Sequence, residues 1–173
     1  MRPTSLTRAI AGPAPLSRAA VLLSLLLVGC DSVEPPSCNF TGEPDFAPSA
    51  GCFTTRDGAL LVVENFKGQI SPPGGSSSRG ESAQCTALRE TWEETGLELT
   101  VGPLLATFDT GFNLYSCTRG PGSGDIDPPP RMEVKGAFYI SADEFDQQEW
   151  RYPGQSGRLQ EMLRRESSQP LLD

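Results

Sequence analysis

The sequence predicts an α/β fold in which two helices pack against a mixed β-sheet. The expected elements follow the order β-β-α-β-β-β-α between residues 51 and 166, and this order is typical of a mixed sheet covered by helices. The chain has 173 residues, which is enough for one domain of ordinary size. We therefore expect one α/β sandwich, preceded by segments with other roles.

The first expected elements are two strands joined by a tight turn. The β-rich runs GCFTT (51–55) and ALLVVEN (59–65) flank Asp57-Gly58, and Asp-Gly is a strong hairpin signal. Glycines and prolines then interrupt the chain at 67–75. A hairpin followed by an irregular segment is the prediction for this region.

A helix is expected over residues 82–95, which are good helix formers. Ser82 can cap its first turn, and Gly96 can take the left-handed conformation that ends a helix. Both boundary signals agree with the composition, so this helix should begin and end at these residues.

The second half of the domain should contain three strands and a terminal helix. The runs 97–110 and 112–117 are expected to pair through a turn at Gly111. Residues 118–131 contain four prolines and three glycines, so they should form a long mobile loop of the kind that borders sites. The remaining expected elements are a strand at 132–140, a short capped helix at 141–145 and a helix at 156–166 with Leu159, Met162 and Leu163 on one face.

The first 29 residues have the features of an export signal. They carry three arginines and no acidic residue, and a ten-residue apolar run at 19–28 that is too short to span a bilayer. The sequence Leu27-Val28-Gly29-Cys30 resembles the lipobox of bacterial lipoproteins. The resemblance implies cleavage before Cys30 and lipidation of that residue, and Asp31 implies retention at the periplasmic side of the inner membrane. An ordinary secretory signal with an incidental Cys30 is the alternative.

The segments on either side of the domain are expected to lack regular structure. Residues 30–50 are rich in Pro, Ser and acids, so they should form a tether to the membrane. Residues 167–173 should form a C-terminal tail.

Four cysteines remain after Cys30, an even number in a compartment that would be oxidising. Two disulfides are expected, and three pairings are possible. We predict Cys38–Cys52, which is local, and Cys85–Cys117, with free buried thiols as the alternative. The absence of Cys-x-x-Cys argues against a zinc site or a redox motif.

The charge balance excludes several classes of function. The chain has 22 acidic and 14 basic residues, no histidine and a net charge of −8. Without the leader, 22 acids face 11 bases, a net charge of −11, so the protein should repel a nucleic-acid backbone. Without histidine, Ser/His and Cys/His catalysis and histidine-based zinc sites are excluded.

Three carboxylates crowd one turn of the expected helix. Glu90, Glu93 and Glu94 fall within about 100° of arc, where like charges destabilise a helix by about 0.2–0.5 kcal/mol per pair. A hard divalent cation such as Mg²⁺ or Mn²⁺ would reverse this effect, because it prefers oxygen ligands. Gly74 and Gly75, just before the helix, leave room for close backbone approach to a metal or phosphate. A solvated acidic surface is the alternative.

The spacing of the whole stretch resembles the Nudix box, G-x5-E-x7-R-E-U-x-E-E-x-G-U, where U is a bulky aliphatic residue. Eight of its nine specified positions agree from Gly75 to Leu97, and Thr91 replaces the first U. The resemblance extends over 51–166. It implies a Nudix-type α/β/α sandwich with a mixed central sheet, a divalent metal, and hydrolysis of the diphosphate in a nucleoside diphosphate derivative or a related organic pyrophosphate.

The resemblance also implies roles for single residues. Glu90, Glu93 and Glu94 would hold metal, with the Gly74 carbonyl as a further ligand. Gly75 and Glu81 would support the turn into the helix, and Arg89 would orient a glutamate. Catalysis would involve Glu93, Arg89 and Glu90; the general base would be Glu93, unless Glu133, Glu144 or another loop acid serves.

Two other functions stay open at this point. One is a catalytically silent Nudix domain that binds a nucleotide or a protein partner, and the other is a structural lipoprotein with an acidic solubilising helix. The substrate is equally open, because export leaves nucleotide sugars, ADP-ribose, dinucleotides and lipid-linked diphosphates as options. Five aromatic residues could stack on a base or belong to the core: Phe108, Phe112, Tyr115, Phe138 and Tyr139.

Overall fold

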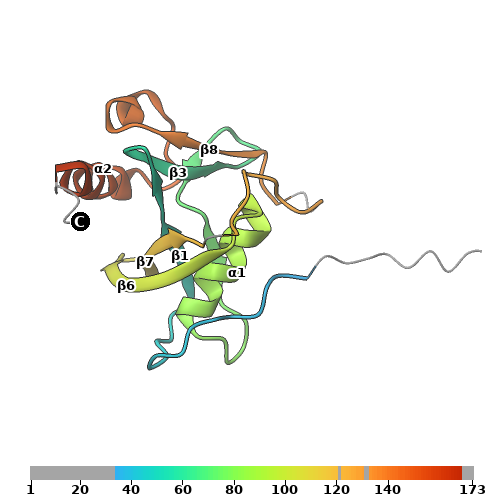
Figure 1. Ribbon diagram of the computed structural model, residues 1–173. Coiled ribbons are helices and arrows are strands. Elements are labelled where there is room, and N and C mark those ends of the chain that lie inside the picture. Colours follow the sequence, from blue (N-terminus) through green and yellow to red (C-terminus); the bar gives the residue numbers. More distant parts are fainter. Residues whose placement is uncertain (1–33, 121, 131–132, 169–173) are drawn as a thin grey trace, which may run out of the picture. The chain divides into compact units, whose positions relative to one another are not determined.

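The computed structural model describes residues 34–120, 122–130 and 133–168, which belong to the unit Val33–Asp173 (Figure 1). The expected leader, the lipidation site Cys30 and residues 169–173 lie outside the described residues. The elements are β1 Ser49–Phe53, β2 Thr55–Arg56, β3 Ala59–Glu64, β4 Ile70–Ser71, β5 Gly74–Ser76, α1 Ala83–Thr95, β6 Leu99–Thr107, β7 Phe112–Arg119, β8 Gly136–Ile140, the 3₁₀ helix η2 Ala142–Gln147, and α2 Pro153–Ser168. Within these ranges no helix has the length and hydropathy of a membrane span.

The α/β prediction is confirmed, but the strands form two sheets instead of one. The first is mixed and has the order β5-β1-β7-β6, with β1 parallel to β7. The second is antiparallel, with β2, β4 and β8 all paired to β3. Thr54 lies between β1 and β2 and bonds to both sheets. Its hydroxyl donates to the Cys117 carbonyl on β7, and its carbonyl accepts from the Leu61 N–H on β3.

The predicted hairpin forms between β2 and β3. Asp57 and Gly58 both have positive φ, 53° and 77°, as a two-residue hairpin turn requires. The first part of the expected strand, however, joins the other sheet as β1. One extended run therefore supplies strands to two sheets, and periodicity alone does not reveal where it divides.

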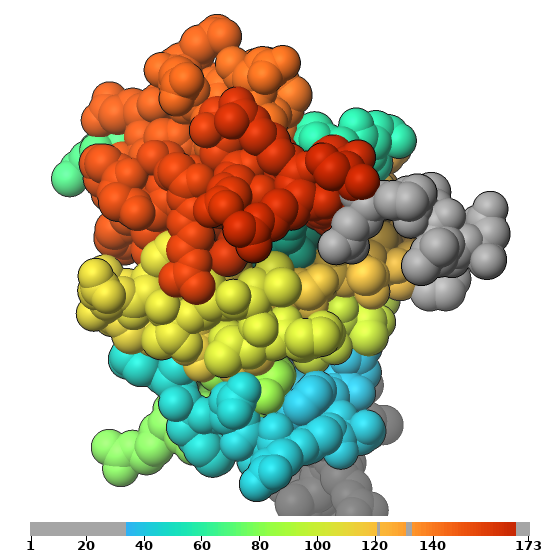
Figure 2. Space-filling model, turned by 90° about the vertical axis from the view of Figure 1, so that its left-hand side faces the viewer, coloured from blue at the N-terminus to red at the C-terminus, as the bar shows by residue number. Residues whose placement is uncertain are grey.

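Each helix covers its own apolar core, which gives the α/β/α layering seen in Figure 1. Ala83 and Ala87 of α1 pack on the mixed sheet, while Leu159 and Leu163 of α2 pack on the core between that sheet and the second one. Figure 2 shows α2 lying across the same face as β6. Alternate residues of the strands supply the two cores, as in a sheet buried on both faces.

The predicted helix boundaries are confirmed for α1. The Ser82 side chain accepts a hydrogen bond from the Cys85 N–H, and Gly96 ends the helix with φ 74°. The short capped helix also forms, with the Glu144 carboxylate accepting from the N–H and hydroxyl of Ser141. The terminal helix begins at Pro153, earlier than expected, since proline is favoured in the first turn of a helix.

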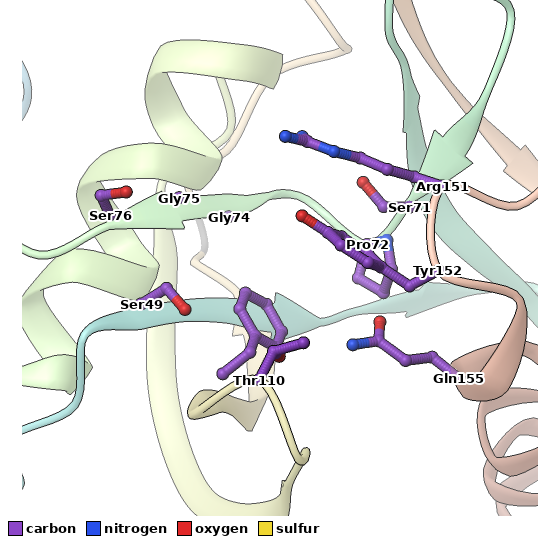
Figure 3. A pocket seen from close by; sticks show the side chains of 11 residues that line it. Ser49, Ser71, Pro72, Gly74, Gly75, Ser76, Thr110, Arg151, Tyr152 and Gln155 are labelled. Atoms are coloured by element: carbon purple, nitrogen blue, oxygen red, sulfur yellow. The ribbon is translucent and has the colours of Figure 1, made fainter.

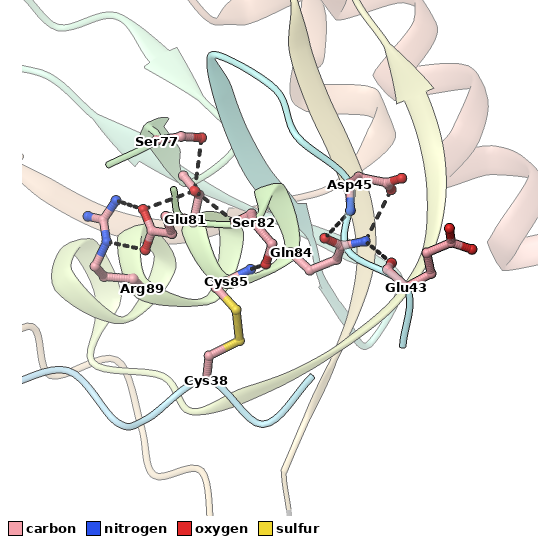
Figure 4. Close-up of a disulfide and its surroundings, with 10 residues drawn as sticks. Cys38, Glu43, Asp45, Ser77, Glu81, Ser82, Gln84, Cys85 and Arg89 are labelled. Atoms are coloured by element: carbon pink, nitrogen blue, oxygen red, sulfur yellow. Dashed lines mark hydrogen bonds and ion pairs between the residues drawn. A yellow bond between two sulfur atoms is a disulfide. The ribbon is translucent and has the colours of Figure 1, made fainter. Parts of the chain in front are cut away.

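The predicted disulfide pairing is wrong. Cys38 bonds to Cys85 (Figure 4) and Cys52 bonds to Cys117, with Cα–Cα distances of 5.3 and 5.5 Å. Cys52 and Cys117 lie on β1 and β7, which are neighbours in the mixed sheet although 65 residues separate the two cysteines. The pairing follows the order of strands in the sheet, which sequence separation does not reveal.

The predicted tether is held on the domain from Cys38 onward. Beyond the disulfide to α1, the Asp45 N–H donates to the Gln84 side chain at 3.0 Å, and its carboxylate accepts from the Tyr115 hydroxyl at 2.9 Å. The Ala47 carbonyl accepts from Ser77. The folded domain therefore begins before residue 51, and its N-terminal segment is fixed to the first turns of α1.

Candidate active site

The glycine pair before α1 allows strand β5 to pass close to two other parts of the chain. A Cβ atom on Gly74 would meet the Ala50 carbonyl oxygen of β1 at 2.5 Å. One on Gly75 would overlap the Glu90 carboxylate of α1. Small residues are therefore required here so that Glu90 can fold back over β5.

Arg89 organises the carboxylates of the predicted box. Its Nε and Nη2 donate to Glu81 at 2.8 and 2.9 Å, and its Nη1 donates to Glu90 at 2.8 Å and Glu93 at 3.1 Å. Nη2 also donates to the Ser76 carbonyl at 3.0 Å. A guanidinium has five N–H donors, and these five bonds engage all of them. Arg89 is thus fixed in place and orients two glutamates instead of one.

Glu81 forms an ion pair with Arg89 and holds its guanidinium in place (Figure 4). Its carboxylate also accepts from the Ser78 N–H at 2.9 Å and the Thr86 hydroxyl at 3.1 Å. The hydrogen bond from Arg89 is the main cause that lowers the pKa of Glu81 to about 2, although burial opposes it. Glu81 is therefore ionised over the whole neutral range and braces the loop that leads into α1.

Three carboxylates converge at this end of α1. One oxygen each from Glu90, Glu93 and Glu133 lies within 4.8 Å of the other two. Glu93 is buried, Glu90 is partly buried and Glu133 is exposed. Burial raises the pKa of Glu90, while Arg89 opposes the rise. A cluster of hard oxygen donors at this spacing fits Mg²⁺ or Mn²⁺, so the residues present suit the expected cation.

Glu94 faces the same region but is held differently. The Gly74 N–H donates to its carboxylate at 2.8 Å, and only 8% of the residue is exposed. Burial raises the pKa of Glu94 to about 8, and the charges of Glu90 and Glu133 add to the rise. Glu94 is therefore adjacent to the cluster of Glu90, Glu93 and Glu133 but, among the described residues, does not belong to it. The Gly74 N–H thus positions Glu94, and the expected role of the Gly74 carbonyl as a metal ligand stays a prediction.

The acids outside the box separate into two kinds. Glu133 joins the carboxylate cluster, whereas the Glu144 carboxylate caps η2 and is engaged there. Of the general bases that the sequence left open, Glu133 and Glu93 therefore lie at the cluster. The hydrogen bonds from Ser141 lower the pKa of Glu144, as suits a helix cap.

A cavity of about 240 Å³ opens next to Gly74 and Gly75 (Figure 3). Its other walls come from β4, from the loop before β7 and from the start of α2, and they include Phe112, Arg151, Tyr152 and Gln155. Of the five aromatic residues singled out in the sequence, Phe112 is the one that lines this cavity. The other four belong to the core or pack against it: Phe108, Tyr115, Phe138 and Tyr139.

Sequence reasoning missed Arg151, Tyr152 and Gln155. They precede or begin α2, whereas the other walls of the cavity come from residues between 49 and 76 and from Thr110 and Phe112. The only local signal is a cation and an aromatic residue directly before Pro153, which by itself indicates no site.

Thr91, the one departure from the box, is fully buried. Its exposed fraction is 0%, and within the described part of the chain its hydroxyl has no hydrogen-bond partner. The methyl group packs as an aliphatic residue would, but the hydroxyl is buried at a cost.

Comparison with known proteins decides the family. The NUDIX domain profile matches residues 45–161. The chain belongs to the NUDIX domain family. This Nudix match begins at Asp45, within the segment that the structure fixes to the domain, and it covers every residue of the predicted box.

Solved structures with the same fold support the assignment. An ADP-ribose pyrophosphatase from Streptococcus suis matches 72% of this chain and 94% of its own, at 17% identity and a TM-score of 0.59. A UDP-X diphosphatase matches over 73% of this chain and 66% of its own, at 18% identity and a TM-score of 0.57. An Ap4A hydrolase from C. elegans matches over 70% and 99%, at 17% identity and a TM-score of 0.55. No curated protein matches significantly.

The predictions of a Nudix fold and of a Nudix hydrolase are confirmed. Nudix hydrolases act on small-molecule diphosphates and generally need divalent metal ions. Identities below 20% to these structures show the fold alone, so the substrate has to be inferred from this chain's own residues.

Proposed function

We propose that this Nudix domain hydrolyses the diphosphate linkage of a nucleoside diphosphate derivative with the help of Mg²⁺ or Mn²⁺. The observation that carries the proposal is the convergence of Glu90, Glu93 and Glu133 within 4.8 Å, with Arg89 orienting two of them. Arg89 is shared with Glu81 and offsets only part of the repulsion among three carboxylates at this distance, so a bound metal cation would stabilise them further. A protein that only needed a soluble surface would gain nothing from holding them together.

The proposed metal ligands are Glu90, Glu93 and Glu133, with Glu94 next to them. When bound, the cation neutralises charge on the diphosphate and lowers the pKa of a coordinated water. Arg89 keeps Glu90 and Glu93 in one orientation through its hydrogen bonds, and Glu81 keeps Arg89 in place. Gly74 orients Glu94 through its N–H, at the edge of the cavity.

The general base is proposed to be Glu133 or Glu93. Glu133 is exposed and can reach solvent, while Glu93 is buried and held by Arg89. An exposed carboxylate can exchange its proton with bulk water after each turnover, which favours Glu133.

We also propose that the domain acts outside the cytoplasm, anchored at Cys30. The support is the basic leader, the short apolar run and the Leu-Val-Gly-Cys sequence, together with two disulfides in the domain. Labelling cells with a radioactive or alkyne fatty acid tests this, since wild type should take up the label and Cys30→Ser should not. A wild-type protein that is soluble and unlabelled would disprove the anchor.

The activity is tested by incubating the purified mature domain with a panel of diphosphates. The panel contains ADP-ribose, UDP-glucose, a diadenosine polyphosphate and a prenyl diphosphate, each with EDTA, Mg²⁺ or Mn²⁺. We expect turnover of at least one compound with metal and none in EDTA. Nucleotide binding without turnover under every condition would instead indicate a catalytically silent domain.

A further inference from the structure

The start of α2 presents the polar end of a largely buried side chain to the cavity. Gln155 is 7% exposed, and its backbone N–H donates to the Tyr152 carbonyl at 2.9 Å. Its side-chain amide, in contrast, has no hydrogen-bond partner among the described residues, and its polar atoms stay accessible from the cavity although the residue as a whole is buried. Figure 3 shows this amide directed into the cavity, so a ligand can reach its donor and its acceptor.

A cation without a counterion lies beside it. Within the described residues, no carboxylate is within ion-pair distance of Arg151. The guanidinium lies 5.3 Å from the centre of the Tyr152 ring, and its charge lowers the pKa of Glu94. Arg151 is therefore placed between the cavity and the carboxylates, where a phosphate of a bound diphosphate would lie.

The backbone of this segment is rigidly held. The Arg151 N–H donates to the Ile70 carbonyl at 2.9 Å, and the Ile70 N–H donates to the Glu149 carbonyl at 2.8 Å. The neighbouring Trp150 is buried and packs on Phe145, with ring centres 4.9 Å apart. The backbone that carries Arg151 is thus fixed before any ligand binds, which lowers the entropic cost of recognition.

The walls and size of the cavity suit one flat ring. Phe112 and Tyr152 supply aromatic surface, and Tyr152 remains 41% exposed. The volume of about 240 Å³ is below the 300–1,000 Å³ of pockets that take whole drug-sized ligands, so it fits one end of a substrate. An amide with both a donor and an acceptor complements the polar edge of a nucleobase, which also carries both.

We propose that Gln155 and Arg151 determine which substrates bind. The Gln155 amide hydrogen-bonds the edge of a nucleobase that contacts Phe112 and Tyr152, and Arg151 binds a phosphate oxygen of the same nucleotide. The proposal deepens the proposed function and rests on it only in assuming that this nucleotide is half of the diphosphate that is cleaved. Base recognition can be measured without turnover, so the two can fail separately.

The first test is metal-free binding, measured by NMR titration in EDTA. The probes are AMP, GMP, CMP and UMP, with ribose 5-phosphate as the base-free control. We expect wild type to bind at least one nucleotide about tenfold or more tightly than ribose 5-phosphate, and Gln155→Met to lose that preference. Equal binding of nucleotides and ribose 5-phosphate by wild type, or unchanged preference in Gln155→Met, would overturn the proposal.

Two further variants separate recognition from folding. Gln155→Glu keeps the shape of the side chain and removes its donors, so it should change which nucleotide binds best while its thermal midpoint stays near that of wild type. Arg151→Gln should weaken nucleotides and ribose 5-phosphate by the same factor, about 10-fold or more, because both carry the phosphate. The matched control is Arg158→Gln, since Arg158 also lies over an aromatic ring, Phe108 at 5.4 Å, but outside the cavity. If Arg151→Gln binds as well as Arg158→Gln, the phosphate role is wrong.

Discussion

Arg89 and Arg151 lie on opposite sides of the candidate site and differ in how their charge is used. All five N–H donors of Arg89 are engaged in hydrogen bonds to Glu81, Glu90, Glu93 and the Ser76 carbonyl. Arg151 makes no ion pair within the described residues and stacks only on Tyr152. A saturated arginine can orient neighbouring groups but cannot bind a further ligand, whereas an unsaturated one can. We therefore expect the residues on α1 to fix the geometry of the site and the residues at the start of α2 to bind the substrate.

Glu81 and Glu94 also differ, in the direction in which the pKa of each carboxyl group is shifted. Glu81 lies against Arg89 and its pKa falls to about 2, whereas Glu94 has no cation in contact and its pKa rises to about 8. Burial is the largest cause of the rise for Glu94, whereas for Glu81 the hydrogen bond from Arg89 outweighs the opposing effect of burial. Glu81 is a fixed structural anion, and Glu94 takes up or releases a proton according to its surroundings.

The largest effect should follow from loss of a ligand on the α1 side. Glu93→Gln keeps the side-chain shape but removes one of the three converging charges, so turnover with Mg²⁺ should fall by about 100-fold or more. Steady-state kinetics on a substrate found in the diphosphate panel measure this. Glu98→Gln is the control, because Glu98 is exposed and follows the end of α1 at Gly96. Equal losses in both variants would show that Glu93 has no special role.

The next largest effect should distinguish the two arginines by stability. Arg89→Gln leaves three partly buried carboxylates without their cation, so the free energy of unfolding should fall by about 3–5 kcal/mol. Arg151→Gln should change it by less than about 0.5 kcal/mol, as for an exposed residue without an ion pair. Urea unfolding at pH 7 compares the variants. Similar destabilisation by Arg89→Gln and Arg151→Gln would contradict the view that Arg89 orients the site while Arg151 binds ligand.

The disulfide within the mixed sheet should contribute somewhat less. Replacing Cys52 and Cys117 by alanine removes a cross-link between residues 65 positions apart and should lower the free energy of unfolding by about 2–4 kcal/mol. Peptide mapping without reductant should first find Cys38–Cys85 and Cys52–Cys117. Four free thiols, or a Cys38–Cys52 bridge, would contradict this arrangement of strands.

Stability should depend on pH through Glu94. In the metal-free protein its pKa is about 8 against 4.5 when unfolded, so the folded state binds more protons between these values. Stability must then fall as pH rises from about 5 to 8, by at most about 1.4 kcal/mol per unit for one proton. Glu81 has the opposite sign, since its stabilising effect is lost as pH falls from 4.5 toward 2.

Urea unfolding in EDTA at several pH values measures this dependence. Glu94→Gln cannot ionise and should flatten the decline above pH 5, while the loss at acid pH should remain. A decline of the same slope in Glu94→Gln would assign the effect to another group.

The smallest predicted effect concerns Thr91, the one residue that departs from the Nudix box. Thr91→Val keeps the branched shape and removes a buried hydroxyl that has no partner, so the free energy of unfolding should rise by about 1 kcal/mol. Thr95→Val is the control and should destabilise, because the Thr95 hydroxyl donates to the Thr91 carbonyl and accepts from the Leu97 N–H. If Thr91→Val destabilised as much as Thr95→Val, the buried hydroxyl would have to be satisfied in solution.

The sequence predicts the α1 side well because its signals are local. Ser82, Gly96 and the spacing of the glutamates all lie within one helix and its caps, and their arrangement follows from helical geometry. The hydrogen bonds between Arg89 and Glu81 are not predicted from the sequence, although only the start of α1 separates the two residues. The cluster is completed from outside by Glu133, which the sequence offered only as one of several bases.

The remaining features depend on contacts between distant segments. The disulfide pairing and the division of strands between two sheets follow from β1 lying next to β7, which periodicity does not show. The hydrogen bond from the Gly74 N–H to Glu94 likewise depends on β5 pairing with β1 next to α1. Gln155 is even less predictable, since its importance lies in the absence of a partner.

The central claim is that the carboxylates on α1 and Glu133 form a metal site, and a Mn²⁺ titration followed by electron paramagnetic resonance tests it most directly. Wild type should bind Mn²⁺ at pH 7.5 and release it when Mg²⁺ is added. Glu90→Gln combined with Glu93→Gln should weaken Mn²⁺ binding by about 100-fold or more, because two of three converging anions are lost, while Glu98→Gln should bind as wild type. A wild-type protein that binds no Mn²⁺, or a double variant that binds it equally well, would contradict the claim.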